Sequence, residues 1–198
     1  MNALPLIDAE PPERADAARN RRRVLDAARR LFESDPGCVT MEAVAAAAGV
    51  GKGTVFRRFG DRAGLARAVI SEAESELQER MIRGEPPLGP GAPARERLVA
   101  FGAAYLAFLD DHAKLLMEAE GTQTARLTST VYALYRTHVT VLLQEAGGGP
   151  HSAYLADVLM APLAAPAFLY HRLVRGLSLE ELIAAYEDLV NRLLDSTR

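Results

Sequence analysis

Apolar side chains recur every three or four residues along most of this chain, and that period predicts helices rather than strands. The first predicted helix runs from about Ala18 to Ser34, and the Asp35-Pro36-Gly37 stretch ends it. Two short helices follow, separated by a turn around Gly49, and a long helix covers about 62–83. The first 83 residues therefore indicate an all-α fold.

The remainder of the chain shows the same helical period. The expected helices cover about 94–111, 112–120, 123–146, 151–175 and 178–195, which brings the total to about nine. Glycine and proline mark the breaks at 84–93 and at 147–150. Ser178 and Glu181 have the spacing of a capping box, and Pro162 and Pro166 should kink the penultimate helix.

This pattern divides the chain into three parts. Residues 1–17 mix proline and charge without a period, so we expect a disordered tail. Residues 18–64 should form a three-helix DNA-binding domain, and residues 65–198 a helical regulatory and dimerisation domain.

The segment from Thr40 to Leu65 carries the clearest functional pattern. Thr40 is placed to cap a short helix that Gly49 ends, and Gly51 can begin the next one. In the helix at 52–59, one face holds Val55 and Phe59, whereas cationic and hydroxyl side chains cover the rest. A helix of this kind suits the DNA major groove. Charge alone would equally fit a solvated basic helix, but the helix–Gly turn–helix spacing favours a helix-turn-helix.

The sequence AGVGKGTVFRRFGDRAGL at residues 48–65 resembles the signature of the tetracycline-repressor (TetR/AcrR) family, roughly A-G-V-S-x-G-T-[LIV]-Y-x-H-F-x-[SND]-K-[ED]-x-L. With the preceding helix, the resemblance covers about residues 18–65. This chain departs from the pattern at six positions. Gly51 replaces Ser, Arg58 replaces His, Arg62 replaces Lys, and Ala63 and Gly64 replace an acidic pair. Phe56 replaces Tyr and therefore lacks a hydroxyl that would bind phosphate. The resemblance implies these DNA-binding residues: Arg22, Thr40, Lys52, Gly53, Thr54, Phe56, Arg57, Arg58 and Arg62.

The charge distribution agrees with a nucleic-acid surface at one end. Residues 14–67 contain twelve Arg or Lys against six Asp or Glu, a net charge of +6. Because the whole chain carries −3, the remainder carries −9. One basic segment on an acidic protein is typical of a DNA-binding domain joined to another module.

Two sets of residues in the second half invite functional interpretation. An aromatic and polar set could line an apolar cavity with a few polar groups, and the family resemblance implies a small-molecule effector there. A plain core is the alternative for each of its members: Phe101, Tyr105, Phe108, Met117, Tyr132, Tyr135 and His138. Small and apolar residues of the last two helices predict a homodimer interface, with intramolecular packing as the alternative: Ala161, Ala164, Ala165, Phe168, Leu182 and Tyr186.

Other kinds of chemistry find little support in the sequence. The single cysteine, Cys38, excludes an intramolecular disulfide, and we expect it to be a half-buried hydrophobe. The four histidines lack a His–Glu–x–x–His arrangement, and no phosphate loop or nucleophile elbow is present. We expect no enzyme activity, no cofactor and no metal. With neither a signal peptide nor an apolar run long enough to span a bilayer, we expect a cytoplasmic protein without a membrane partner.

The sequence thus predicts a homodimeric transcriptional regulator, a repressor that a small molecule releases from a palindromic double-stranded operator. The long helix beginning at Arg62 would transmit the ligand signal by tilting. A constitutive DNA-binding dimer without a ligand is the main alternative, and a helical enzyme the less favoured one.

Overall fold

The computed structural model of the chain describes residues 12–34, 36–120, 127 and 129–195, and all regular elements in these ranges are helical. The chain forms two compact units that divide between Val69 and Ile70. The predicted all-α fold is confirmed.

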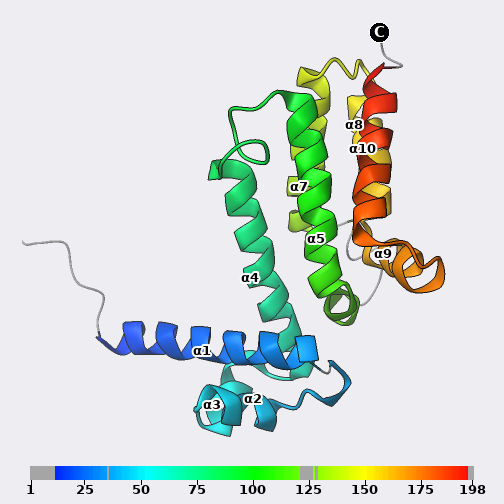
Figure 1. Cartoon of the computed structure of the whole chain (residues 1–198). Helices are drawn as coiled ribbons and strands as arrows, with labels where there is room; N and C mark the ends of the chain where they lie inside the picture. The colour runs from blue at the N-terminus through cyan, green and yellow to red at the C-terminus, as the bar shows by residue number, and fades with distance from the viewer. Residues whose placement is uncertain (1–11, 35, 121–126, 128, 196–198) are drawn as a thin grey trace, which may run out of the picture. The chain divides into compact units, whose positions relative to one another are not determined.

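The first unit contains the three helices of the predicted DNA-binding domain. They are α1 (Pro12–Ser34), α2 (Met41–Ala48) and α3 (Lys52–Phe59), with a short 3-10 turn, η1 (Pro36–Cys38), after α1. In Figure 1, α2 and α3 lie together beside α1. The core holds Val24, Ala28 and Phe32 of α1, with Val44 of α2 and Val55 of α3.

The first helix begins earlier than expected. α1 starts at Pro12, so the prediction of a disordered tail was wrong for residues 12–17, and residues 1–11 lie outside the described part. Proline fixes φ near the helical value, and its missing N–H is not needed in the first turn of a helix. Pro12 therefore begins the helix, although the sequence pattern favoured irregular chain.

The second unit is a helical bundle. The continuous helix α4 (Arg62–Arg83) crosses the division at Val69, and the unit continues with α5 (Ala94–Glu120), α7 (Thr130–Glu145), α8 (Ser152–Met160), η2 (Ala161–Leu163), α9 (Ala165–Leu169), η3 (Tyr170–Val174) and α10 (Leu179–Asp195). α7 packs along α8, and α5 contacts α7, α9 and α10 (Figure 1). The fully buried side chains include Leu98, Phe101, Tyr135, Leu159 and Val190.

Two helix boundaries in this unit differ from the sequence prediction. The helices expected at 94–111 and 112–120 are one helix, α5, because no glycine or proline separates them. Conversely, the helix expected at 151–175 is broken into α8, η2, α9 and η3 around Pro162 and Pro166. The nine α-helices among the described residues thus match the expected number, but the division differs. In the helix expected at 123–146, residues 123–126 and 128 lie outside the described part, and α7 begins at Thr130 with Ser129 as its N-cap.

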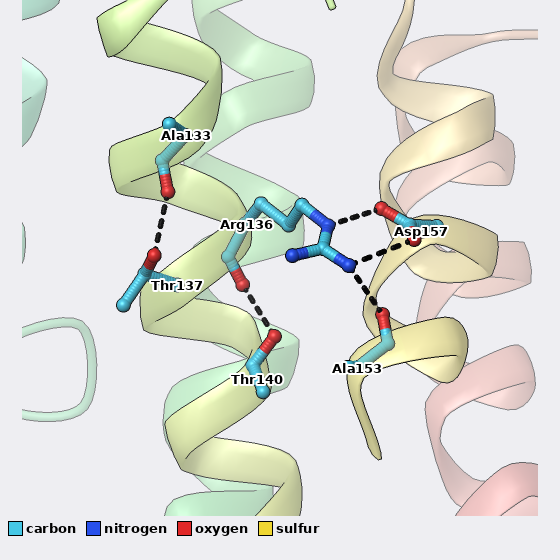
Figure 2. Close-up of polar contacts among 6 residues, drawn as sticks. All are labelled: Ala133, Arg136, Thr137, Thr140, Ala153 and Asp157. Carbon is cyan, nitrogen blue, oxygen red and sulfur yellow. Dashed lines mark hydrogen bonds and ion pairs between the residues drawn. The ribbon is translucent and has the colours of Figure 1, made fainter. Parts of the chain in front are cut away.

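Three arginines tie the helices of the second unit together at their polar edges. Arg95 of α5 donates to Asn191 at 3.0 Å and to Asp195 at 2.7 Å on α10. Arg172 of η3 pairs with Asp110 of α5 at 3.0 Å. Figure 2 shows the third tie, in which Arg136 of α7 binds Asp157 of α8 through two nitrogens, at 2.5 and 3.1 Å.

Among the described residues, no single helix is both long enough and apolar enough to cross a bilayer. The segments Ser152–Leu163 and Ala165–Val174 are together long and apolar enough to do so, but the chain bends by 47° between them.

Candidate nucleic-acid interface and ligand site

The turn between α2 and α3 has the geometry that the sequence predicted. Thr40 Oγ1 accepts a hydrogen bond from Ala43 N at 3.1 Å and so caps α2, as expected. Gly49 ends α2 in the left-handed region, with φ of 63°, which favours glycine. A Cβ at Gly49 would also lie 2.7 Å from Nη2 of Arg23, so the end of that side chain would have to shift if the glycine were replaced.

The outer face of α3 is open to solvent. Val55 is fully buried, while Lys52, Gly53 and Arg57 are exposed and Thr54 is half-buried. A Cβ at Gly53 would meet nothing within 4 Å. This face can therefore approach another surface with its backbone as well as with its cations.

Lys52 forms an ion pair with Glu42 of α2, and its ammonium also lies 5.5 Å from the ring centre of Phe56. The hydrogen bond from Lys52 is the main reason that the pKa of Glu42 is lowered. Water screens an ion pair this exposed, so it is held only weakly. A DNA phosphate could therefore displace the carboxylate at little cost.

Two other predicted DNA-binding residues have partners inside the first unit. Arg58 Nη1 donates to the carbonyl oxygen of Ala17 at 3.0 Å, and the Arg62 guanidinium lies 5.3 Å from the ring centre of Phe32. Arg57 and Arg22 are exposed, and neither has an ion pair with a described residue. Whether any of the nine residues contacts DNA stays a prediction.

The sequence did not distinguish the roles of Arg21 and Arg23. Arg21 lies over the ring of Phe59, 6.0 Å from its centre, and Arg23 lies beside Gly49. These contacts join α1 to α3 and to the turn. The paired residues are too far apart in the sequence for a helical period to predict that they meet.

Within the second unit, five members of the predicted ligand set lie together. Phe101 and Tyr105 of α5 contact Tyr135 of α7 with ring centres 5.8 and 5.2 Å apart. His138 lies 5.7 Å from Phe101, and Phe108 lies 5.6 Å from Tyr105. We call these five residues the aromatic cluster. Met117, 47% exposed, and Tyr132, which lines a different groove, are not among these ring contacts.

The aromatic cluster contains polar atoms without hydrogen bonds. Tyr135 Oη and His138 Nε2 have no hydrogen-bond partner among the described residues, although the Gln78 side chain lies near Tyr135. Burial raises the pKa of Tyr135, and it lowers the pKa of His138 to about 4, with a further contribution from Arg97. Both groups are therefore neutral at pH 7.

The groove beside Tyr132 has a volume of about 710 Å³ and lies between α7 and α8. Its polar wall is the Arg136–Asp157 pair, and its apolar lining includes Met160, Ala161 and Ala164. In Figure 2 the third guanidinium nitrogen of Arg136 carries no dashed line. The groove was not predicted, because its two sides are at least twenty residues apart in the sequence.

The predicted dimer residues are mostly inside the single chain. Ala164, Ala165, Phe168, Leu182 and Tyr186 are between 0% and 9% exposed, and Ala161 alone among the six is exposed. These five side chains pack within the single chain, where α9 and α10 both contact α5, and their role in a dimer stays a prediction. Cys38 is exposed, which contradicts the expected half-burial.

Comparison with known proteins identifies the N-terminal segment. Residues 24–69 match the family model described as bacterial regulatory proteins, tetR family. The chain is 36% identical over 81 residues to the HTH-type transcriptional repressor LfrR of Mycolicibacterium smegmatis. The matched stretch spans 41% of this chain and 42% of that repressor, less than half of each.

Solved structures extend the similarity of fold to most of the chain. A transcriptional regulator from Rhodococcus sp. RHA1 superposes with a TM-score of 0.68 and 20% identity, covering 89% of this chain and 96% of that one. A TetR-like transcriptional regulator from the same organism gives 0.61 and 22%, with the same coverage. At these identities the similarity shows the fold.

Proposed function

We propose that this chain, whose residues 24–69 match the tetR family of bacterial regulatory proteins, is a DNA-binding transcriptional repressor that acts as a dimer and responds to a small molecule. The observation that carries the proposal is the helix-turn-helix of the first unit, in which α3 exposes Lys52, Gly53 and Arg57 on one face. A regulator, rather than an enzyme, is the function that this surface favours.

In the proposed complex, α3 enters the major groove and the exposed cations meet phosphates. Arg57 is the sharpest probe, because it is exposed and has no ion pair with a described residue. Losing one phosphate contact should weaken binding to all sequences similarly and reduce the salt slope by about one. Arg58 is a less direct probe, since its bond to Ala17 also joins α3 to α1.

The test is a fluorescence-anisotropy titration with DNA from upstream of the chain's own gene, at several salt concentrations. Arg57→Ala should lower affinity about tenfold, whereas the control Arg83→Ala should bind as the wild type does. Arg83 is also an exposed arginine, on α4 in the second unit, and is paired with Glu79 at 3.2 Å. Equal affinity and salt slope for the Arg57 variant and the wild type would contradict the proposed interface.

A dimer is proposed because one helix-turn-helix reads only half of a site. Two half-sites one DNA turn apart are separated by about 34–36 Å, so the operator should be a near-palindrome. Exposed apolar residues of η3, Leu173 at 68% and Val174 at 71%, are the candidates for the contact between copies. Sedimentation should give twice the chain mass of 21.4 kDa, and Leu173→Asp should shift it towards the monomer. A dimer that Leu173→Asp leaves intact would place the interface elsewhere.

The effector site is proposed at the aromatic cluster. Neutral Tyr135 and His138 offer unpaired polar atoms among aromatic rings, which is the usual composition of a small-molecule site. Gln78, which lies near Tyr135, belongs to α4, and α4 is continuous with the first unit. A ligand that prefers one conformation of α4 would change DNA affinity, because only differential affinity shifts such an equilibrium.

A further inference from the structure

The exposed face of α3 carries one large apolar side chain, Phe56, among its polar residues. Phe56 is 39% exposed, whereas Val55, the preceding residue, is fully buried in the core of the first unit. Lys52 and Gly53, one helical turn before Phe56, and Arg57 after it are also exposed. Residues three and four apart are neighbours on a helix, so Lys52, Gly53 and Phe56 share one face. The ring therefore lies on the face that the proposed function directs into the major groove.

The surroundings of Phe56 leave part of its ring open. The ammonium of Lys52 lies 5.5 Å from the ring centre, and Lys52 is itself held by its ion pair with Glu42 of α2. Gly53 has no side chain that could cover the ring, and even a Cβ there would meet nothing within 4 Å. A partner that approaches this face can therefore contact the ring directly, next to the cations.

The chemistry of the ring limits what it can recognise. A phenylalanine side chain has no hydrogen-bond donor or acceptor, so it cannot hydrogen-bond a phosphate or a polar base edge. The apolar group that a base pair presents in the major groove is the C5-methyl of thymine, and phenylalanine is one of the side chains that contact it. We propose that Phe56 packs against this methyl group and so selects thymine at one position of each half-site. This inference rests on the DNA-binding function proposed above.

Phe56 then differs in role from the charged residues beside it. Contacts to phosphate position a protein on DNA and carry no direct sequence information, whereas contacts to base edges specify the sequence. Arg57 should therefore contribute affinity for any DNA, together with its salt dependence. Phe56 carries no charge, so it should contribute discrimination between bases and leave the salt slope unchanged.

The experiment removes the methyl group from the DNA, one thymine at a time. The DNA fragment of the titration above is synthesised with 2′-deoxyuridine in place of a single thymidine, at each position in turn, and titrated with the full chain by fluorescence anisotropy. The wild type should bind about fourfold more weakly when the contacted methyl is missing, which is the loss expected for one buried methyl group. The equivalent thymine of the other half-site should show the same effect.

Substitutions in the protein then assign the effect to Phe56. Phe56→Ala should bind the unmodified DNA more weakly, but removing the sensitive methyl should have no further effect, because its partner is gone. Phe56→Tyr keeps the ring and should keep the methyl effect. The matched control is Arg57→Ala, which should bind every fragment more weakly and still show the full methyl effect. If circular dichroism showed Phe56→Ala to be unfolded, Phe56→Gln, with a longer polar side chain, should abolish the methyl effect in its place.

Two results would overturn the inference and leave the proposed function intact. One is wild-type binding that no single deoxyuridine weakens, and this result needs no variant protein. The other is an equal methyl effect in the wild type and in the folded Phe56 variant without the ring, because a different residue would then contact that thymine. If the wild type bound none of the DNA, the proposed function would fail together with this inference.

Discussion

Replacing Gly102 with alanine should destabilise the second unit, because the new methyl group would overlap the ring of Tyr186. A Cβ at this position would lie well inside van der Waals contact of Cδ1 and Cε1 and only 2.7 Å from Cζ. Carbon atoms normally approach to about 3.5–4.0 Å. Tyr186 is 4% exposed, and the open space beside its ring is the cavity of about 210 Å³ that it lines, so relieving the overlap would cost the ring its packing on α5.

The expected magnitude comes from two opposing effects. Overpacking a filled core costs about 1–3 kcal/mol, and direct overlap with a buried ring places this substitution near the upper limit. Alanine in a helix is favoured over glycine by about 1 kcal/mol. The overlap outweighs the propensity, so Gly102→Ala should lower the free energy of unfolding by about 2 kcal/mol.

The matched control is Gly53→Ala in α3, another helical glycine, where a Cβ would meet nothing within 4 Å. That substitution should stabilise its unit by up to about 1 kcal/mol. Urea unfolding followed by far-UV circular dichroism measures the free energy of unfolding of both variants. Hydrogen exchange of α5 and α10 shows whether Gly102→Ala acts on these two helices. Replacing the ring with a smaller side chain, in Tyr186→Leu, should remove part of the decrease in the free energy of unfolding that Gly102→Ala causes. If Gly102→Ala were as stable as the wild type, the contact between Gly102 and Tyr186 would not limit packing. The same conclusion would follow if the destabilisation by Gly102→Ala and that by Tyr186→Leu simply added in the double variant.

Two further predictions concern groups of the second unit. His138, with a folded pKa of about 4 against about 6.5 unfolded, contributes stability that is present above pH 6.5 and lost as pH falls towards 4. Because His138 is partly exposed, the stability lost is reduced to on the order of 1–2 kcal/mol. In His138→Gln the urea midpoint should therefore change less between pH 7.5 and pH 4.5 than in the wild type. An equal change in both proteins would show that His138 does not cause the pH dependence. For the half-exposed Arg136–Asp157 pair, a double-mutant cycle of alanine variants should give a coupling of about 0.5–1 kcal/mol, and a value of zero would show that the contact adds no stability.

The sequence by itself determined the features that depend on near neighbours along the chain. Thr40 caps α2, and Ser178 and Glu181 form the capping box at α10, with reciprocal hydrogen bonds of 3.1 and 2.7 Å. Gly49 ends α2 as expected, and the polar face of α3 is exposed. Each of these involves residues at most four positions apart, so one local pattern contains all the participants.

Helix ends were less certain wherever two local signals opposed each other. Pro12 begins a helix although it lies in a stretch rich in proline and charge, whereas Pro162 and Pro166 break one. The same residue has opposite effects because a helix tolerates proline in its first turn but loses a backbone hydrogen bond to it in the interior.

Only the tertiary structure decided which side chains meet. It placed Phe168 and Tyr186 in the core of a single chain, and it brought Arg136 to Asp157. It also left a cavity of about 210 Å³ beside α10, lined by Leu106, Phe168 and Tyr186 among others. A helical period shows which face of a helix is apolar, but many partners could cover that face. The choice among them follows from the shapes and volumes of all the packed side chains together, and no single segment contains that information.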